Sequence, residues 1–141
     1  NAIHQVKSKN RDRNIIPKLQ YPEDSNDLLV RGNSGLLEIA LENLLDNACK
    51  FSTEDITIEL FITDKSINIT VSDKGIGIPS KELANIYSPF KRASNAKFIG
   101  GFGIGLSLVA KIMELHDATL NISSIENEGT SVKMLFKRMM V

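Results

Sequence analysis

The sequence predicts an α+β fold, a two-layer sandwich in which one mixed, mainly antiparallel sheet is covered on one face by helices. Two observations predict it. Apolar residues recur at helical spacing in two segments, and the remaining ordered segments alternate in the manner of half-buried strands. Their order is strands, helix, two strands, long loop, helix, two strands, which is typical of α+β domains. A length of 141 residues suits one domain, which we assign to residues 13–141, with residues 1–12 as the remnant of a linker.

The first ordered segments are short. Residues 1–12 are basic and polar, as expected of a solvated chain end. Ile15 to Tyr21 and Leu28 to Arg31 are plausible strands, separated by a polar turn from Pro22 to Asp27.

A long helix is predicted from Ser34 to Phe51. Its apolar residues fall at i, i+4, i+7, i+8 and i+11 and form one stripe: Leu37, Leu41, Leu44, Leu45 and Ala48. Ser34 is the expected N-cap, because serine oxygens accept hydrogen bonds from the free N–H groups of a first helical turn.

Two half-buried strands follow, because apolar and polar residues alternate over residues 56–63 and 67–72, with a tight turn at Asp64 and Lys65. The stretch from Asp73 to Gly103 is expected to be a long functional loop, with a helical turn near Lys81 to Ile86.

The chain then returns to regular structure. Leu106 to Leu115 has helical spacing of its apolar residues. A last hairpin is predicted from Leu120 to Ile125 and from Ser131 to Lys137, around a turn at residues 126–129.

Composition excludes several classes of protein. With 17 basic and 17 acidic residues, no net field attracts nucleic acid. The single cysteine, Cys49, excludes an internal disulfide and a zinc site of several cysteines, which suits a reducing compartment such as the cytoplasm. No apolar run reaches the roughly 20 residues that span a bilayer. Because the chain begins at Asn1 and not at an initiator methionine, we expect it to be a fragment of a larger protein. We expect this fragment to be monomeric.

The first chemical constellation lies on the long helix. Asn43, Asn47 and Lys50 occur at i, i+4 and i+7 and therefore share a stripe on the side away from the leucines. Amide oxygens suit Mg²⁺, and lysine neutralises phosphate. A solvated polar face, as surface helices normally show, is the alternative.

The second constellation is the sequence Asp-Lys-Gly-Ile-Gly-Ile-Pro at residues 73–79, directly after a strand. The carboxylate of Asp73 could accept a hydrogen bond from an exocyclic amine, and Gly75 and Gly77 would let the chain turn close to a ligand ring. A plain turn is the alternative.

The third constellation is the glycine-rich stretch at residues 100–105, which opens the second helix. Backbone N–H groups and the helix dipole favour an anion there. No Gly-Lys-[Ser/Thr] follows, and Leu106 breaks the dinucleotide-binding register, so neither motif is present. A flexible loop is the alternative.

Together these motifs closely resemble the boxes of sensor histidine kinases. Residues 42–51 (ENLLDNACKF) resemble the asparagine box, 73–79 (DKGIGIP) the first glycine box, 88–92 (SPFKR) the phenylalanine box and 101–107 (GFGIGLS) the second glycine box. Order and spacing agree over about residues 28–137. The resemblance implies a Bergerat-type ATP-binding fold with a mobile ATP lid from about Ser80 to Gly100.

The resemblance also implies roles for particular residues. Asn47 would hold Mg²⁺, Asn43 and Lys50 would orient the phosphates, and Phe51 would flank the nucleotide. Asp73 would accept the adenine amino group. The remaining implied contacts with the nucleotide come from the two glycine boxes, the lid and a late strand: Gly75, Gly77, Ile78, Phe90, Arg92, Gly101, Phe102, Gly103, Ile104, Gly105, Leu106 and Thr130.

The implied reaction is transfer of the γ-phosphoryl group of Mg–ATP to a histidine, with Asn43, Arg92 and, at a lower rank, Glu42 as catalytic residues. The acceptor box is absent, so the histidine would lie on dimerisation helices elsewhere in a membrane-anchored parent protein, which would serve a response regulator. His4 and His116 are not expected to be phosphorylated; His116, near a helix end, suits capping or packing. Asp117 and Ala118 depart from a glycine pair frequent in the family.

Two other functions remain open: a degenerate module that senses ATP without transferring phosphate, and a serine kinase or ATPase of the same superfamily. ATPase relatives commonly have a glutamate where Asn43 stands, and asparagine here favours the histidine kinases.

Overall fold

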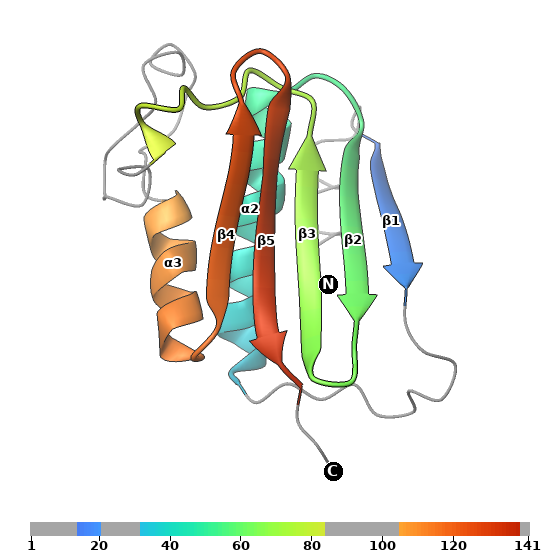
Figure 1. Ribbon diagram of the computed structural model, residues 1–141, viewed down its shortest axis with the longest axis vertical. Coiled ribbons are helices and arrows are strands. Elements are labelled where there is room, and N and C mark those ends of the chain that lie inside the picture. Colours follow the sequence, from blue (N-terminus) through green and yellow to red (C-terminus); the bar gives the residue numbers. More distant parts are fainter. Residues whose placement is uncertain (1–13, 21–31, 84–104, 139–141) are drawn as a thin grey trace.

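The computed structural model describes residues 14–20, 32–83 and 105–138. Five strands form one sheet in the order β1-β2-β3-β5-β4, and two helices cover one of its faces (Figure 1). Strand β1 (Ile15–Gln20) pairs in parallel with β2 (Ile56–Ile62), whereas all other pairs are antiparallel. The predicted mixed two-layer α+β fold is confirmed.

Helix α2 (Ser34–Phe51) has the predicted bounds but a different cap. The side chain of Asn33, not Ser34, accepts a hydrogen bond from the N–H of Leu36, at 3.0 Å. The N-cap prediction was therefore wrong by one residue, because asparagine and serine cap equally well and Asn33 has the extended backbone that the position needs.

Strands β2 and β3 (Ser66–Asp73) form the predicted hairpin. Thr63 and Ser66 close its turn: the N–H of Thr63 donates to the carbonyl of Ser66 at 2.9 Å, and their hydroxyls are 2.8 Å apart. Only Asp64 and Lys65 remain at the tip, as predicted.

Helix α3 (Gly105–Leu115) and the strands β4 (Thr119–Ile125) and β5 (Gly129–Lys137) complete the fold. Asp117 and Asn127, with φ of 51° and 67°, occupy the turns before β4 and between β4 and β5. Gly129, whose φ is 143°, is the first residue of β5.

The core lies between the sheet and the two helices. From α2 the core receives five residues at less than a tenth of full exposure. Three belong to the predicted stripe, Leu44, Leu45 and Ala48, and two lie beside it, Ala40 and Cys49. Alternate residues of the strands face them, together with one side of α3: Ile56, Ile58, Val71, Val109, Ile112, Met113, Val132, Met134 and Phe136. Leu37 and Leu41 pack at its margin.

The two helices run antiparallel and are joined at one end by His116. Its Nε2 accepts the N–H of Asn33 at 3.0 Å, and its Nδ1 lies 2.7 Å from the carbonyl of Ile112. The imidazole also fills the space beside Gly32, where a Cβ would come within 2.4 Å of the ring. The predicted packing role of His116 is confirmed.

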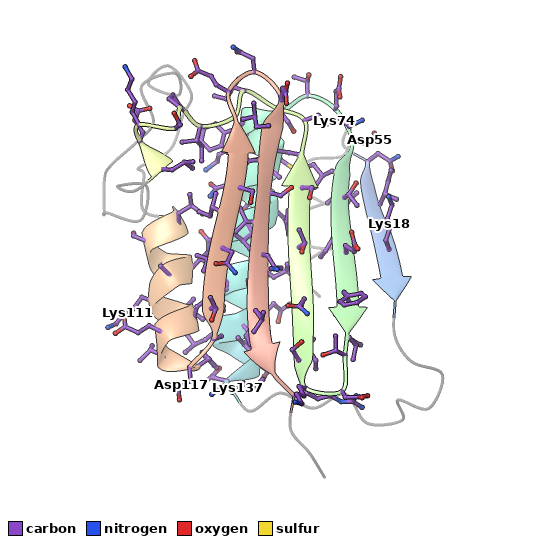
Figure 2. All side chains as sticks on the ribbon, viewed as in Figure 1. Lys18, Asp55, Lys74, Lys111, Asp117 and Lys137 are labelled. Atoms are coloured by element: carbon purple, nitrogen blue, oxygen red, sulfur yellow. The ribbon has the colours of Figure 1, made fainter. Side chains whose placement is uncertain are left out.

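Charged side chains lie at the ends and on the outside of the sandwich (Figure 2). Asp55 and Lys74 lie at the end of the sheet where β3 finishes, Asp117 and Lys137 at the opposite end, and Lys111 on the outer side of α3. All five are exposed. None of the described helices is long and apolar enough to cross a membrane.

Several predictions concern residues outside the described ranges. They are the linker at 1–12, the turn from Pro22 to Asp27, the strand from Leu28 to Arg31 and most of the expected lid. Of the predicted helical turn near Lys81 to Ile86, the described part is a turn that ends at Leu83, in which the N–H of Glu82 donates to the carbonyl of Pro79 at 2.9 Å.

Candidate functional site

The asparagines of α2 face the first residue of α3. A Cβ built on Gly105 would lie 3.4 Å from both amide atoms of Asn47 and 3.5 Å from Oδ1 of Asn43. Both asparagines are half-buried. Their stripe therefore borders the start of a second helix and is not simply a solvated face.

A hydrogen bond fixes the orientation of the Asn43 amide. Its Nδ2 donates to the carbonyl of Ile39 one turn earlier, at 2.8 Å, which leaves Oδ1 directed toward Gly105. The amide of Asn47 has no hydrogen-bond partner within ranges 14–20, 32–83 and 105–138. Oδ1 of Asn43 and the amide of Asn47 thus both lie beside the N-terminus of α3.

The other predicted residues of α2 lie around this pair. Lys50 is exposed in the last turn, and Phe51 is the half-buried last residue. Glu42 is half-buried, but successive helical residues point about 100° apart, so it does not share the row of Asn43 and Asn47.

The turn after β3 docks on the C-terminal end of α2. Oδ1 of Asp73 accepts the N–H of Gly75 at 2.9 Å, and the N–H of Ile76 donates to the carbonyl of Phe51 at 3.0 Å. A Cβ on Gly75 would lie 2.0 Å from that carbonyl oxygen. Only glycine permits this approach, which brings the second predicted motif against the first.

The same turn also docks on the β4–β5 hairpin. Gly77 has φ of 67°, and a Cβ there would lie 2.1 Å from the carbonyl oxygen of Ile125. The carbonyl of Ile76 accepts the N–H of Asn127 at 2.7 Å, and the N–H of Ile78 donates to Oγ of Ser124 at 2.7 Å. The turn is therefore held from two sides.

A small apolar cluster lies beneath this turn, next to the main core. Ile78 is its buried centre, and its other members come from α2, the turn region, α3 and β4: Phe51, Ile76, Leu83, Leu106 and Ile122. Four segments distant in the sequence thus form one apolar wall.

Polar residues from three strands continue that wall. Asp73 pairs with Thr130 across β3 and β5, and Thr130 pairs with Ser124 across β5 and β4. Each lies two residues from the core row of Val71, Val132 and Ile122 on its own strand, so the three share the helix-covered face of that row.

Four residues of this region were not predicted from the sequence to belong to the site: Ser124, Ile76, Leu83 and Ile122. Ser124 had a detectable signal: Leu120, Ile122 and Ser124 share one side of the alternating strand, and a serine at a core-facing position indicates a specific hydrogen-bond partner. Leu83 had none, because its place depends on the path of a non-periodic segment.

The remaining predicted site residues lie outside the described ranges: Phe90, Arg92, Gly101, Phe102, Gly103 and Ile104. Among the residues that the structure describes, no group of three or more His, Cys, Asp or Glu side chains could hold a metal ion.

Comparison with known proteins gives consistent results. Residues 32–139 match the family described as "Histidine kinase-, DNA gyrase B-, and HSP90-like ATPase". The sensor histidine kinase YkoH of Bacillus subtilis (strain 168) is 34% identical over 115 residues, which are 80% of this chain and 25% of YkoH. The chain thus spans about a quarter of the length of that relative.

Solved structures show the same fold. The mycobacterial sensor histidine kinase MprB superposes with a TM-score of 0.86 at 23% identity, over 99% of this chain and 93% of the other. Full-length ShkA, solved in complex with AMPPNP, superposes with a TM-score of 0.77 at 18% identity, over 99% of this chain and 30% of ShkA.

Proposed function

Because the chain belongs to the family of histidine kinase-, DNA gyrase B- and HSP90-like ATPases, we propose that it binds Mg–ATP and transfers the γ-phosphoryl group to a histidine on a separate dimerisation domain. One observation carries the proposal: the asparagine row, the start of α3 and the Asp73 turn, which are far apart in the sequence, meet at one end of the sheet (Figure 1). The similarity to sensor histidine kinases favours histidine as the acceptor.

The base of the nucleotide is assigned to the Asp73 turn. A carboxylate accepts hydrogen bonds only, so Asp73 is suited to an exocyclic amino group such as that of adenine. Gly75 and Gly77 let the turn pack closely against the backbone of Phe51 and Ile125, which holds Asp73 at this place. Ile78, Phe51 and Leu106 offer the ring an apolar wall. Thr130, the cross-strand partner of Asp73, borders the same place.

The triphosphate is assigned to the space between α2 and the start of α3. The first N–H groups of a helix point out of its N-terminus, which is also the positive end of its dipole, so the start of α3 suits an anion. Asn43 and Lys50 would orient phosphate oxygens there, together with Gly101, Gly103 and Gly105. The missing side chain of Gly105 fits this assignment, since a Cβ would occupy the space beside both amides.

The same geometry fits a magnesium ion. Asn47 would hold it through its amide oxygen, and the ion would supply positive charge that neutralises the phosphates. Phosphoryl transfer depends mainly on positioning and charge neutralisation, so the chain's own task is to hold the nucleotide in line with an incoming histidine. Arg92 would add positive charge near the γ-phosphate, and Phe90 would secure the lid.

The proton of the acceptor histidine needs a base. We assign this role to an acidic residue beside that histidine on the partner domain, and place Glu42 second because it lies off the asparagine row. The acceptor helices would belong to the same parent protein, which we propose to be membrane-anchored, with this domain on its cytoplasmic side. A response regulator would receive the phosphoryl group from the histidine.

The decisive experiment combines the chain with labelled ATP and a separately made helical hairpin that carries an acceptor histidine. We expect Mg²⁺-dependent label on the hairpin and slow hydrolysis without it. A hairpin with histidine replaced by alanine is the matched control. Nucleotide binding without transfer would instead identify a sensing module, and rapid hydrolysis without an acceptor would identify an ATPase.

A further inference from the structure

Ser124 makes three contacts with one hydroxyl group. The N–H of Ile78 donates to its Oγ at 2.7 Å, its Oγ donates to the carbonyl of Gly129 at 3.0 Å, and its Oγ lies 2.8 Å from Oγ1 of Thr130. These contacts join the Asp73–Ile78 turn to both strands of the β4–β5 hairpin.

The number of available protons determines the direction of each hydrogen bond of Ser124. A serine hydroxyl has one proton and two lone pairs. The carbonyl of Gly129 has no proton, so the proton of Ser124 is used there. The contact between the two hydroxyls must then use the proton of Thr130, and Ser124 becomes fully saturated, with one bond donated and two accepted.

This arrangement determines the hydrogen bonds that Thr130 can make. Because its proton is donated to Ser124, Oγ1 of Thr130 has only lone pairs for any other partner. Its cross-strand neighbour Asp73 is likewise an acceptor when ionised. Two acceptors, side by side on the helix-covered face, favour a ligand amino group at the place that they border and disfavour a carbonyl oxygen at that place.

We propose that Ser124 is a positioning residue that fixes Thr130 as a hydrogen-bond acceptor and thereby helps the site to select a purine with an amino group over one with a carbonyl group. The inference rests on the proposed function. It assigns to Ser124 a part in base selection without direct contact with the nucleotide.

The test compares ATP with inosine triphosphate, in which a carbonyl replaces the amino group at C6 of the base and N1 gains a proton. Affinities of both are measured by calorimetry for the whole chain and for Ser124→Ala. Loss of the Ser124 oxygen frees the proton of Thr130 to donate to the carbonyl of inosine. The preference for ATP should fall about tenfold, equivalent to about 1.4 kcal/mol.

Two variants separate base selection from simple loosening of the fold. Ser124→Thr keeps the hydroxyl and should restore the preference, whereas Ser123→Ala, on the exposed opposite side of the same strand, should leave it unchanged. A purely structural role for Ser124 would weaken both nucleotides equally, and an unchanged ratio of affinities in folded Ser124→Ala contradicts the inference.

A second measurement covers the case in which Ser124→Ala does not fold. Thr130→Val, nearly the same shape, removes the acceptor itself and should also lower the preference for ATP; a full preference in that variant overturns the inference. Failure of the unaltered chain to bind ATP would contradict the proposed function as well, whereas intact ATP binding with an unchanged preference contradicts only the role of Ser124.

Discussion

At the scale of single residues, Asp73 has a role in the fold as well as its proposed role in binding the nucleotide base. Its Oδ1 accepts the N–H of Gly75 and thereby shapes the turn that follows β3. An asparagine at this position can still accept that bond through its amide oxygen but presents a donor where the carboxylate presents only acceptors.

We therefore expect Asp73→Asn to fold normally and to bind ATP more weakly. A hydrogen bond to a charged group contributes about 1.5 to 3 kcal/mol, so the loss should be about tenfold or more. Calorimetric titration measures it. Asp64→Asn, in the exposed β2–β3 turn, is the matched control. Unchanged affinity in Asp73→Asn would remove Asp73 from the base site.

Asn47→Ala should abolish the Mg²⁺ dependence of both nucleotide binding and transfer, because it removes the proposed metal-binding oxygen beside Gly105. ATP affinity is compared in excess Mg²⁺ and in excess chelator, in this variant and in Asn121→Ala on the exposed face of β4. Full Mg²⁺-dependent activity of Asn47→Ala would refute the metal assignment.

At the scale of elements, the N-terminus of α2 holds this helix, and with it the asparagine row, in position. The first turn of a helix has four N–H groups without helical partners, and here Asn33 satisfies one of them through its side chain. Its own N–H is bonded by His116 from the end of α3. Asn33 therefore both caps α2 and links it to the end of α3.

Asn33→Ala should lower the free energy of unfolding by about 1 kcal/mol, the usual effect of losing an N-cap. Ser34→Ala is the informative control, because Ser34 is the cap that the sequence suggests and the structure does not use; its effect should be within about 0.5 kcal/mol. Denaturant unfolding of both variants measures the difference. Equal effects would contradict the cap at Asn33.

His116→Ala should loosen the junction of α2 with α3, because it removes the acceptor for the N–H of Asn33 and empties the space beside Gly32. A lost hydrogen bond of this kind costs about 0.5 to 1.5 kcal/mol. Hydrogen exchange resolves the change along the chain: protection should fall in the first turn of α2, while Lys111→Ala leaves it unchanged. If protection in the first turn of α2 did not fall in His116→Ala, the junction between α2 and α3 would be contradicted.

At the scale of the whole molecule, the candidate site joins α2, the start of α3, the Asp73 turn and the β4–β5 hairpin. The Asp73 turn bridges the end of α2 and the β4–β5 hairpin, and α3 begins against α2. A ligand held by all of these parts binds the folded chain alone, so its binding free energy adds to the free energy of unfolding.

ATP with Mg²⁺ at a hundred times its Kd should therefore stabilise the chain by about 2.7 kcal/mol. Thermal unfolding at fixed protein concentration detects this as a rise in Tm. At the same ATP concentration Asp73→Asn should show a smaller rise, because its Kd is higher. The absence of any rise in the unaltered chain would show that ATP does not bind the folded state.

Much of this molecule follows from local pattern. The bounds of α2 were predicted to the residue, and both hairpins were predicted within one or two residues at each strand end, because the alternation and helical spacing of apolar residues are strong where one face is buried. The error at Ser34 arose because adjacent asparagine and serine have nearly equal capping preference, and only the backbone angles choose between them.

The sequence by itself determined the two-layer class, the elements and the motifs that place this chain in its family. The tertiary structure decided what the motifs face: the asparagine row against Gly105, Gly75 against Phe51, and Ser124 bonded to both Ile78 and Thr130. The reason is physical. Periodicity records which side of an element is buried, whereas the partner on that side depends on strand order and register, which are fixed only when distant segments pack together.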